Sequence, residues 1–375
     1  MKVIKPGSNI GILGGGQLGR MIVIAGRNMG YRFNTLDPTP DSPCGQVADR
    51  QLLAPFSDVN AAKELADLSD VITYEFENVD SDVASILETT SYVPQGSGLL
   101  KITQNRIREK TTLQSFGVPV APFKVIETEK DIYSATERLG LPCIMKTATG
   151  GYDGKGQWVI RSKDNINVAI EAWNKSGMDM IIEQFIPFSK ELSVIVARNV
   201  QGQTKTFPAA ENVHINNILH QSIVPARITN EQTIQAETIA LKIAESLQVV
   251  GLIAIEMFLT NDGKIIVNEL APRPHNSGHY SMDACITSQF EQHIRAICGL
   301  PLGDTTLLSP IIMVNILGQH VSKVLDKIDQ LPPTAKIHLY GKKESVENRK
   351  MGHINFLGAT LEQVNQQIND LQIWT

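Results

Sequence analysis

The sequence has few cysteines, little excess charge of either sign and no long apolar run, and each shortage excludes a class of protein. Four cysteines in 375 residues rule out a disulfide-stapled module, and no two have the spacing of a metal-ligand pair. The 34 basic and 39 acidic residues leave a net charge of −5, which lacks the basic field of a general nucleic-acid binder. No apolar run approaches the ~20 residues of a membrane helix.

The same composition describes a globular chain. With 42% hydrophobic and 19% charged residues, intrinsic disorder is excluded. At ~150 residues per domain, the length predicts two to three domains with a sizeable core. The first 13 residues lack the apolar segment of a secretory signal, so we expect reduced thiols and a cytoplasmic location.

Strand, glycine-turn and helix patterns alternate over the first part of the chain. A buried strand over 9–13 leads through a glycine turn into a helix over 20–29, and later strand signals end at Asp37 and cover 70–75. Such alternation is typical of a doubly wound parallel sheet. An α/β domain is therefore expected over residues 1–105.

The middle of the chain is richer in hairpin-like strands, which suit a mixed or antiparallel sheet of an α+β domain. A composition shift at 300–304 opens a shorter last region, so we expect the second and third domains over 106–304 and 305–375. The elements expected in the middle region are helices over 101–116 and 230–247 and strands over 142–146, 157–160, 180–183, 191–196, 251–259 and 264–270.

Two glycine-rich segments suggest anion binding. The first, Gly14-x-Gly16-x-x-Gly19 with Asp37 at the end of the next strand, matches the dinucleotide fingerprint, but it also suits a tight turn or a site for a monophosphate or nearby substrate. The second follows Lys146 and runs over 147–156, where backbone amides can fold over phosphates and the lysine adds a point charge. Without the strand-to-helix context of a P-loop, it is equally compatible with a surface hairpin.

Carboxylates on four strands are candidate ligands. Glu183 ends an apolar strand whose backbone suits adenine, and Glu191 suits ribose hydroxyls, although both fit solvated acids as well. If Asp262 and Gly263 form a two-residue hairpin loop, Asn261 pairs with Lys264, and five residues back on each strand Glu256 lies opposite Glu269. Carboxylates ~5 Å apart repel unless a cation lies between them, so magnesium with nucleotide phosphates is predicted. The alternative is that both acids lie on a solvated face.

Two later segments carry basic groups. Arg273 can clamp an oxyanion and His275 can titrate near neutral pH, just beyond the paired carboxylates, although each can also be structural. A cluster over 342–350 stands out in an acidic protein. It suits either a solvated loop or capture of a substrate phosphate.

With these residues in place, the chain resembles the ATP-grasp family over essentially its whole length, and within it the 5-(carboxyamino)imidazole ribonucleotide synthases. The resemblance implies an ATP-grasp fold with an N-terminal pre-ATP-grasp domain, a glycine-loop lid and a small C-terminal domain. It also implies ATP- and bicarbonate-dependent carboxylation of 5-aminoimidazole ribonucleotide through carboxyphosphate, in purine biosynthesis. The motifs that carry it cover residues 14–21, 74–78, 150–158, 268–279 and 349–353.

The family's functional residues transfer by matched position. ATP contacts are implied for Arg106, Lys146, Gly151, Tyr152, Asp153, Gly154, Lys155, Gly156, Gln157, Glu183, Gln184, Phe185, Ile186, Glu191, His214, Asn268 and Glu269. Substrate contacts are implied for Tyr152, Asp153, Arg273, His275, Lys342 and Arg349. Catalytic roles are implied for Arg273, His275 and Asp153. Glu256 and Glu269 are implied to be ligands of magnesium or manganese.

One position departs from the wider family pattern. Ala271 stands where many members have a metal-binding asparagine, so water is expected to fill that coordination position. The resemblance also implies a homodimer with small-molecule substrates only. Alternative functions are a formate-dependent glycinamide ribonucleotide transformylase, an NAD-dependent dehydrogenase, supported only by the glycine fingerprint and Asp37, and a catalytically silent nucleotide-binding protein.

Overall fold

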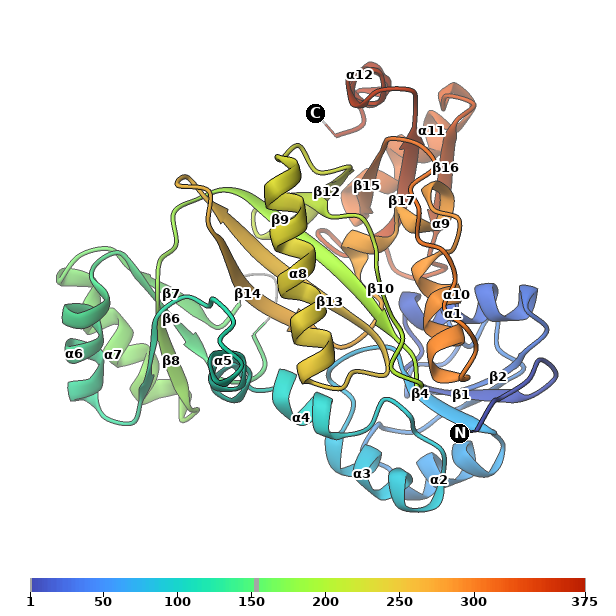
Figure 1. Cartoon of the computed structure of the whole chain (residues 1–375), viewed down its shortest axis with the longest axis horizontal. Coiled ribbons are helices and arrows are strands. Elements are labelled where there is room, and N and C mark those ends of the chain that lie inside the picture. Colours follow the sequence, from blue (N-terminus) through green and yellow to red (C-terminus); the bar gives the residue numbers. More distant parts are fainter. Residues whose placement is uncertain (1, 152–154, 375) are drawn as a thin grey trace.

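The computed structural model describes residues 2–151 and 155–374. Its strands form three sheets: a parallel sheet near the N-terminus, a small antiparallel sheet, and a long sheet between them (Figure 1). Two hydrophobic clusters cover the two faces of the parallel sheet, and a third fills the space between the long sheet and α8 (Asn230–Ser246). None of the described helices is long and apolar enough to span a membrane.

The parallel, doubly wound arrangement predicted for the N-terminal region is confirmed. Its four strands lie in the order β3-β2-β1-β4 and pair in parallel. The strands are β1 (Asn9–Leu13), β2 (Arg32–Leu36), β3 (Arg50–Leu52) and β4 (Val71–Tyr74), and the helices are α1 (Gln17–Asn28), α2 (Val59–Asp67) and α3 (Ser81–Thr90).

The single helix predicted over 101–116 is wrong. Two helices are present, α4 (Gly98–Thr103) and α5 (Arg106–Ser115), because the extended Asn105 between them accepts hydrogen bonds from the amides of Ile107 and Arg108 and so starts a new helix. Figure 1 places α5 between the small sheet and β14 of the long sheet, and α5 contacts both β8 and β14.

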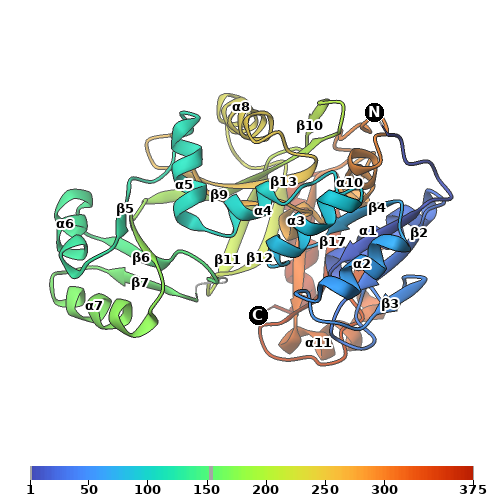
Figure 2. The same ribbon diagram turned by 90° about the horizontal axis from the view of Figure 1, so that it is seen from below.

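The small sheet is antiparallel, with the order β5-β8-β6-β7. Two helices cover one face of it (Figure 2). Its elements are β5 (Phe123–Ile126), β6 (Cys143–Thr147), β7 (Gln157–Ile160), β8 (Met180–Gln184), α6 (Glu129–Leu139) and α7 (Asp164–Ser176).

The long sheet has the order β14-β13-β9-β11-β12-β15-β17-β16, with β10 paired to β9. It crosses position 304, because β12 pairs with β15; the division at 105/106 and 304/305 stays a prediction. Its strands are β9 (Phe188–Arg198), β10 (Thr204–Thr206), β11 (Ala210–Ile215), β12 (Ile218–Val224), β13 (Gly251–Thr260), β14 (Ile265–Ala271), β15 (Ile311–Leu317), β16 (Ala335–Leu339) and β17 (Lys350–Leu357). The remaining helices are α9 (Ser281–Ala284), α10 (Gln289–Ile297), α11 (Val321–Asp326) and α12 (Leu361–Leu371), with short 3₁₀ turns η1 (Asn276–Gly278), η2 (Gly318–His320) and η3 (Ile328–Gln330).

The β13–β14 hairpin shows a wrong prediction and a confirmed one. The loop has three residues rather than two, since the Thr260 amide donates to the Lys264 carbonyl at 2.9 Å. A β-bulge then adds Asn268 to β14, between the pairs Met257↔Val267 and Glu256↔Glu269. The longer loop and the extra residue compensate, so Glu256 does lie opposite Glu269.

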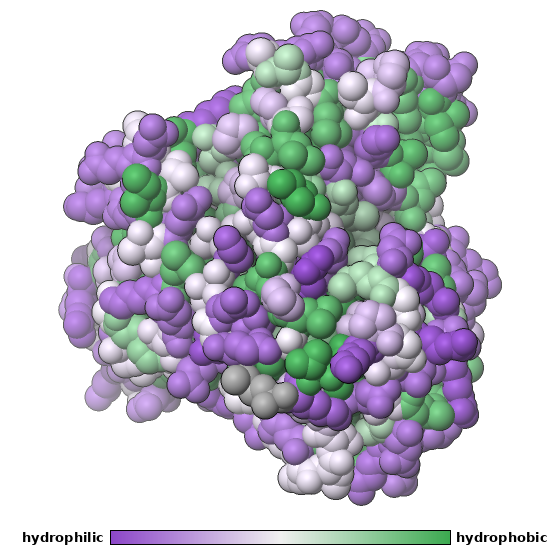
Figure 3. All heavy atoms as spheres, turned by 45° about the vertical axis from the view of Figure 1, so that its right-hand side comes forward, coloured by the Kyte–Doolittle hydropathy of each residue, from purple (hydrophilic) through white to green (hydrophobic). Residues whose placement is uncertain are grey.

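Hydrophobic and hydrophilic residues are interspersed on the face of the molecule shown in Figure 3. Such a mosaic is ordinary for a surface in contact with water. Hydropathy on this face therefore does not mark out an interface for a second copy.

Candidate active site

Lys146, near the end of β6, is held by a buried carboxylate on the neighbouring strand. Its Nζ lies 3.0 Å from Oε2 of Glu183 on β8. The same oxygen lies 3.3 Å from Nζ of Lys110 on α5, a residue that sequence analysis missed. Burial raises the pKa of Glu183, but the two ammonium groups outweigh it and bring the pKa to about 2. The ion pair with Glu183 therefore holds the Lys146 ammonium group in place. N–H groups of this ammonium remain available to an anion.

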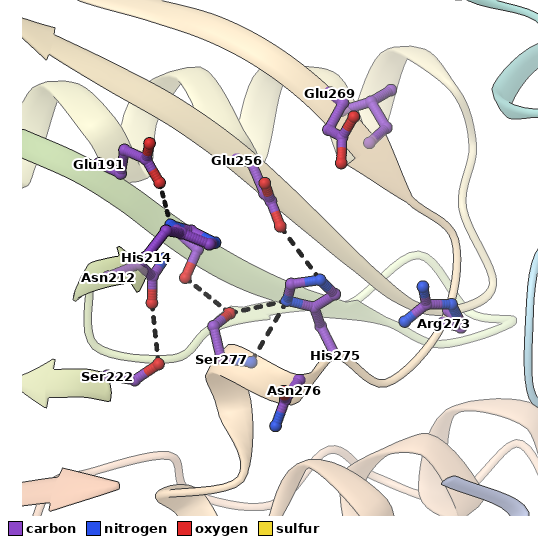
Figure 4. A network of polar contacts seen from close by, with 12 residues as sticks. Glu191, Asn212, His214, Ser222, Glu256, Glu269, Arg273, His275, Asn276 and Ser277 are labelled. Atoms are coloured by element: carbon purple, nitrogen blue, oxygen red, sulfur yellow. Dashed lines mark hydrogen bonds and ion pairs between the residues drawn. The ribbon is translucent and has the colours of Figure 1, made fainter. Parts of the chain in front are cut away.

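The paired carboxylates of β13 and β14 each have a cationic or ionisable partner. Glu269 Oε2 lies 3.1 Å from the Arg106 guanidinium of α5, and Glu256 Oε1 lies 3.1 Å from Nε2 of His275. Figure 4 shows Glu256 and Glu269 side by side on the two strands. Burial disfavours the charge on Glu256, yet the hydrogen bond from His275 lowers its pKa to about 2, so Glu256 is charged at neutral pH.

This donor set fits magnesium. Two carboxylates on adjacent strands supply hard oxygen ligands; Glu269 faces the Arg106 guanidinium and Glu256 faces the His275 ring. Within the described residues no cluster of three or more histidine, cysteine, aspartate or glutamate side chains is placed to hold a metal ion. The protein would therefore supply two ligands, with nucleotide phosphate and water completing the shell.

His275 is oriented from both sides of its ring. Its Nδ1 lies 2.8 Å from Oγ of Ser277, which in turn accepts from Ser193 at 2.7 Å, while Nε2 faces Glu256 (Figure 4). Glu191 of β9, predicted to face ribose, pairs with His214 of β11, one of the implied ATP contacts. This pairing outweighs burial and raises the pKa of His214.

Arg273 lies at the wall of a cavity of about 390 Å³ between the N-terminal sheet and the long sheet. It forms an ion pair with Glu77, which follows β4. Burial raises the pKa of Glu77, but the Arg273 guanidinium outweighs this effect and lowers the pKa to about 2. The residues lining the cavity are Gly16, Gln17, Leu18, Asp37, Phe56, Glu75, Phe76, Glu77, Arg273, His275, Asn276 and Lys350.

The glycine turn over 14–19 borders this cavity, but its amides serve the protein's own carboxylates. The Gly15 amide donates to Asp37 at 2.8 Å, and the Gly16 and Gly19 amides donate to Glu75. Burial raises the pKa of Glu75 to about 7 in spite of these two bonds. The cofactor interpretation of the fingerprint therefore does not fit, because a dinucleotide would need the amides that Asp37 and Glu75 occupy.

The basic cluster reaches the same cavity through a different residue than expected. Lys350 at the start of β17 lines it, whereas Lys342 donates to the Lys350 carbonyl at 2.7 Å and lies over the Tyr340 ring. Arg349 is exposed and donates to the Glu344 carbonyl at 3.1 Å. The sequence signals for Lys350 were its membership of the cluster and of the family motif over 349–353.

The other predicted ATP residues lie around Lys146. The Gly151 carbonyl is 3.3 Å from the Arg106 guanidinium, the Gly156 carbonyl accepts from the Thr147 amide at 2.9 Å, and Gln157 pairs with Lys146. Tyr152, Asp153 and Gly154 lie outside the described residues, whereas Lys155 lies within them. Lys110 also donates to the Asn268 carbonyl at 2.9 Å, and the amides of Gln184 and Phe185, which precede Ile186, donate to Pro122 and Pro142.

Comparison with known families matches three successive segments of this chain. Residues 8–104 match the ribonucleotide synthetase preATP-grasp domain, 111–290 the ATP-grasp domain, and 312–367 the phosphoribosylaminoimidazole carboxylase C-terminal domain.

Full-length relatives are similar to the chain as well. The N5-carboxyaminoimidazole ribonucleotide synthase of Bacillus subtilis is 50% identical over 98% of this chain and 96% of its own length, and that of Brucella melitensis 44% over 94% and 96%. A solved N5-carboxyaminoimidazole ribonucleotide synthetase in complex with ADP has a TM-score of 0.96 at 52% identity, covering 100% of this chain and 98% of that one. The Aspergillus clavatus enzyme in complex with ADP and 5-aminoimidazole ribonucleotide has a TM-score of 0.91 at 30% identity, covering 97% of each.

Proposed function

The chain belongs to the N5-carboxyaminoimidazole ribonucleotide synthase family of ATP-grasp ligases, and we propose that the charged strands and the adjoining cavity are where it performs that family's reaction. It is an ATP-dependent ligase of purine biosynthesis that carboxylates the exocyclic amine of 5-aminoimidazole ribonucleotide. One observation carries the placement: His275 lines the cavity and also contacts Glu256 on β13. The ribonucleotide in the cavity would thus lie next to the nucleotide phosphates.

ATP would lie between the small sheet and the long sheet. Lys146 offers a point charge to the phosphates, and Glu191 with His214 faces the ribose. The backbone groups of residues 183–186 would form hydrogen bonds with the adenine. Magnesium, or manganese in its place, held by Glu256 and Glu269, would neutralise charge on the phosphates.

The reaction couples two transfers. A bicarbonate oxygen attacks the γ-phosphorus, which releases ADP and forms carboxyphosphate. The amine then attacks the carboxyl carbon, phosphate leaves, and one proton is lost from nitrogen. The Arg273 guanidinium, held by Glu77, would oppose charge on the carboxyphosphate oxygens. Two groups are candidates to take the proton: His275, held between Ser277 and Glu256, and Asp153.

A direct assay tests the function and its rivals. ADP release should require 5-aminoimidazole ribonucleotide and bicarbonate together, and glycinamide ribonucleotide with formate should not replace them. Nicotinamide fluorescence should not change on mixing with the protein. ADP release that requires glycinamide ribonucleotide and formate would instead assign the transformylase reaction.

We also propose a homodimer and a cytoplasmic location. The family resemblance supports the dimer, and light scattering after gel filtration would test it. The purine role of the relatives and four cysteines that are buried and free of disulfides support a reducing compartment.

Replacing Arg349 tests whether the basic cluster binds the ribonucleotide phosphate. Arg349→Ala should remove a charge-assisted contact of about 1.5–3 kcal/mol and raise the KM for 5-aminoimidazole ribonucleotide roughly ten- to hundred-fold. The KM for ATP should not change. Lys343→Ala, an exposed neighbour in the same cluster, is the matched control and should affect neither constant. If Arg349→Ala raised the KM for 5-aminoimidazole ribonucleotide and the KM for ATP equally, the assignment of the cluster to the ribonucleotide phosphate would be wrong.

The protonation of Lys342 should make ribonucleotide capture sensitive to pH. Burial, with the nearby charges of Arg349 and Lys350, lowers the pKa of Lys342 to about 8. Because the ammonium form exists below that pKa, kcat/KM for 5-aminoimidazole ribonucleotide should fall as pH rises from 7.5 to 9. Lys342→Arg should keep its charge and flatten the profile. A decline that is equally steep in kcat/KM for ATP would assign the effect to another group.

A further inference from the structure

Lys110 on α5 is a charged group for which the proposed function has no role. Its side chain is 1% exposed. A lysine buried to this degree is costly unless its ammonium group is paired, and Lys110 is paired twice. Its Nζ lies 3.3 Å from Oε2 of Glu183 and donates to the backbone carbonyl of Asn268 at 2.9 Å. Both partners belong to strands that carry predicted site residues.

The first partner connects Lys110 to the phosphate-binding lysine. Oε2 of Glu183 receives Lys110 from one side and Lys146 from the other, at 3.3 and 3.0 Å. The three side chains together carry one net positive charge. Because Lys110 neutralises much of the carboxylate, the hydrogens of Lys146 are left available to an anion such as a nucleotide phosphate.

The second partner connects Lys110 to β14, which carries the proposed metal ligand Glu269 and is called the metal strand below. Asn268 is the extra residue of the β14 bulge, and this bulge brings Glu269 opposite Glu256. A bulge leaves one residue outside the regular ladder, so its backbone groups need other partners. Lys110 supplies the donor for the carbonyl of that residue.

We propose that Lys110 is a positioning residue that fixes the phosphate-binding lysine and the metal strand together, through Glu183 on one side and the bulge at Asn268 on the other. This inference deepens the proposed function and rests on it. Because its side chain is 1% exposed, Lys110 would act on the substrates through Lys146 and Glu269. An isolated buried ion pair would instead contribute to stability alone.

The test is the Lys110→Met variant, which keeps the length and apolar stem of the side chain. We expect the KM for ATP to rise at least tenfold and kcat to fall, while the KM for 5-aminoimidazole ribonucleotide stays within twofold. Isothermal titration with ADP in the absence of magnesium should show at least a fivefold loss of affinity. Lys124→Met is the control, because Lys124 lies in the small sheet and pairs with Asp131 at 3.0 Å, and it should change none of these values.

A double-variant cycle tests whether Lys110 acts on Lys146 through Glu183. In magnesium-free ADP binding, Lys110→Met combined with Glu183→Gln should be no weaker than Glu183→Gln alone, since both act on Lys146 through one carboxylate. This comparison also holds if Lys110→Met alone fails to fold. Additive losses would overturn the inference, as would a Lys110→Met variant that melts earlier but keeps wild-type constants. A wild-type protein without ribonucleotide-dependent ADP release would instead overturn the proposed function.

Discussion

A Glu269→Gln variant should fold normally and lose ribonucleotide-dependent ADP release by at least ~100-fold. The change removes half of the paired carboxylate charge proposed to hold magnesium. The fold should survive, because the side chain of Glu269 is 41% exposed and its partner Arg106 still reaches the Gly151 carbonyl. Turnover measured over a magnesium series, with circular dichroism of the same samples, gives both quantities.

Thermal unfolding gives this prediction a second, activity-independent measurement. Magnesium with a non-hydrolysable ATP analogue should stabilise the wild-type protein by mass action, by about 2.7 kcal/mol at one hundred times the Kd. Glu269→Gln should lose the magnesium-dependent part of the shift in Tm. Glu245→Gln, an exposed acid on α8, serves as the control and should keep it. Near-normal magnesium-dependent turnover in folded Glu269→Gln would refute the metal assignment.

An Arg273→Ala variant should lower kcat by roughly 100- to 1,000-fold, the usual cost of losing one charged donor to a developing oxyanion. It should also destabilise the protein, because Glu77 loses its ion-pair partner. These two effects can be separated. Steady-state kinetics and thermal unfolding should therefore be measured on Arg273→Ala, on Glu77→Gln and on the double variant.

The double variant decides between a catalytic and a structural role for Arg273. Replacing Glu77 by glutamine removes the unpaired charge, so the Tm should recover toward that of the wild-type protein. The loss of kcat should remain, because no guanidinium faces the reacting oxygens. Recovery of kcat together with the Tm would show that Arg273 acts only by neutralising Glu77.

Local sequence patterns determined much of the scaffold. The strand, glycine turn and helix at the N-terminus and the strands around Lys146 and Glu183 follow from short-range periodicity and turn chemistry, and the opposition of Glu256 and Glu269 was predicted in the same way. The last of these was predicted from a two-residue loop that is not present. The bulge at Asn268, which no turn signal announces, restored the pairing.

What only the tertiary structure decided is which charges meet. Arg106 and Glu269 are separated by 163 residues, and Lys110 and the Asn268 carbonyl by 158, so no local pattern connects them. The glycine turn matched a dinucleotide fingerprint, but a carboxylate 59 residues later occupies its Gly16 amide. The physical reason is the range of each interaction. Backbone periodicity acts between neighbours and is legible in the sequence, whereas burial brings distant polar groups together and makes each of them find a partner wherever the fold supplies one.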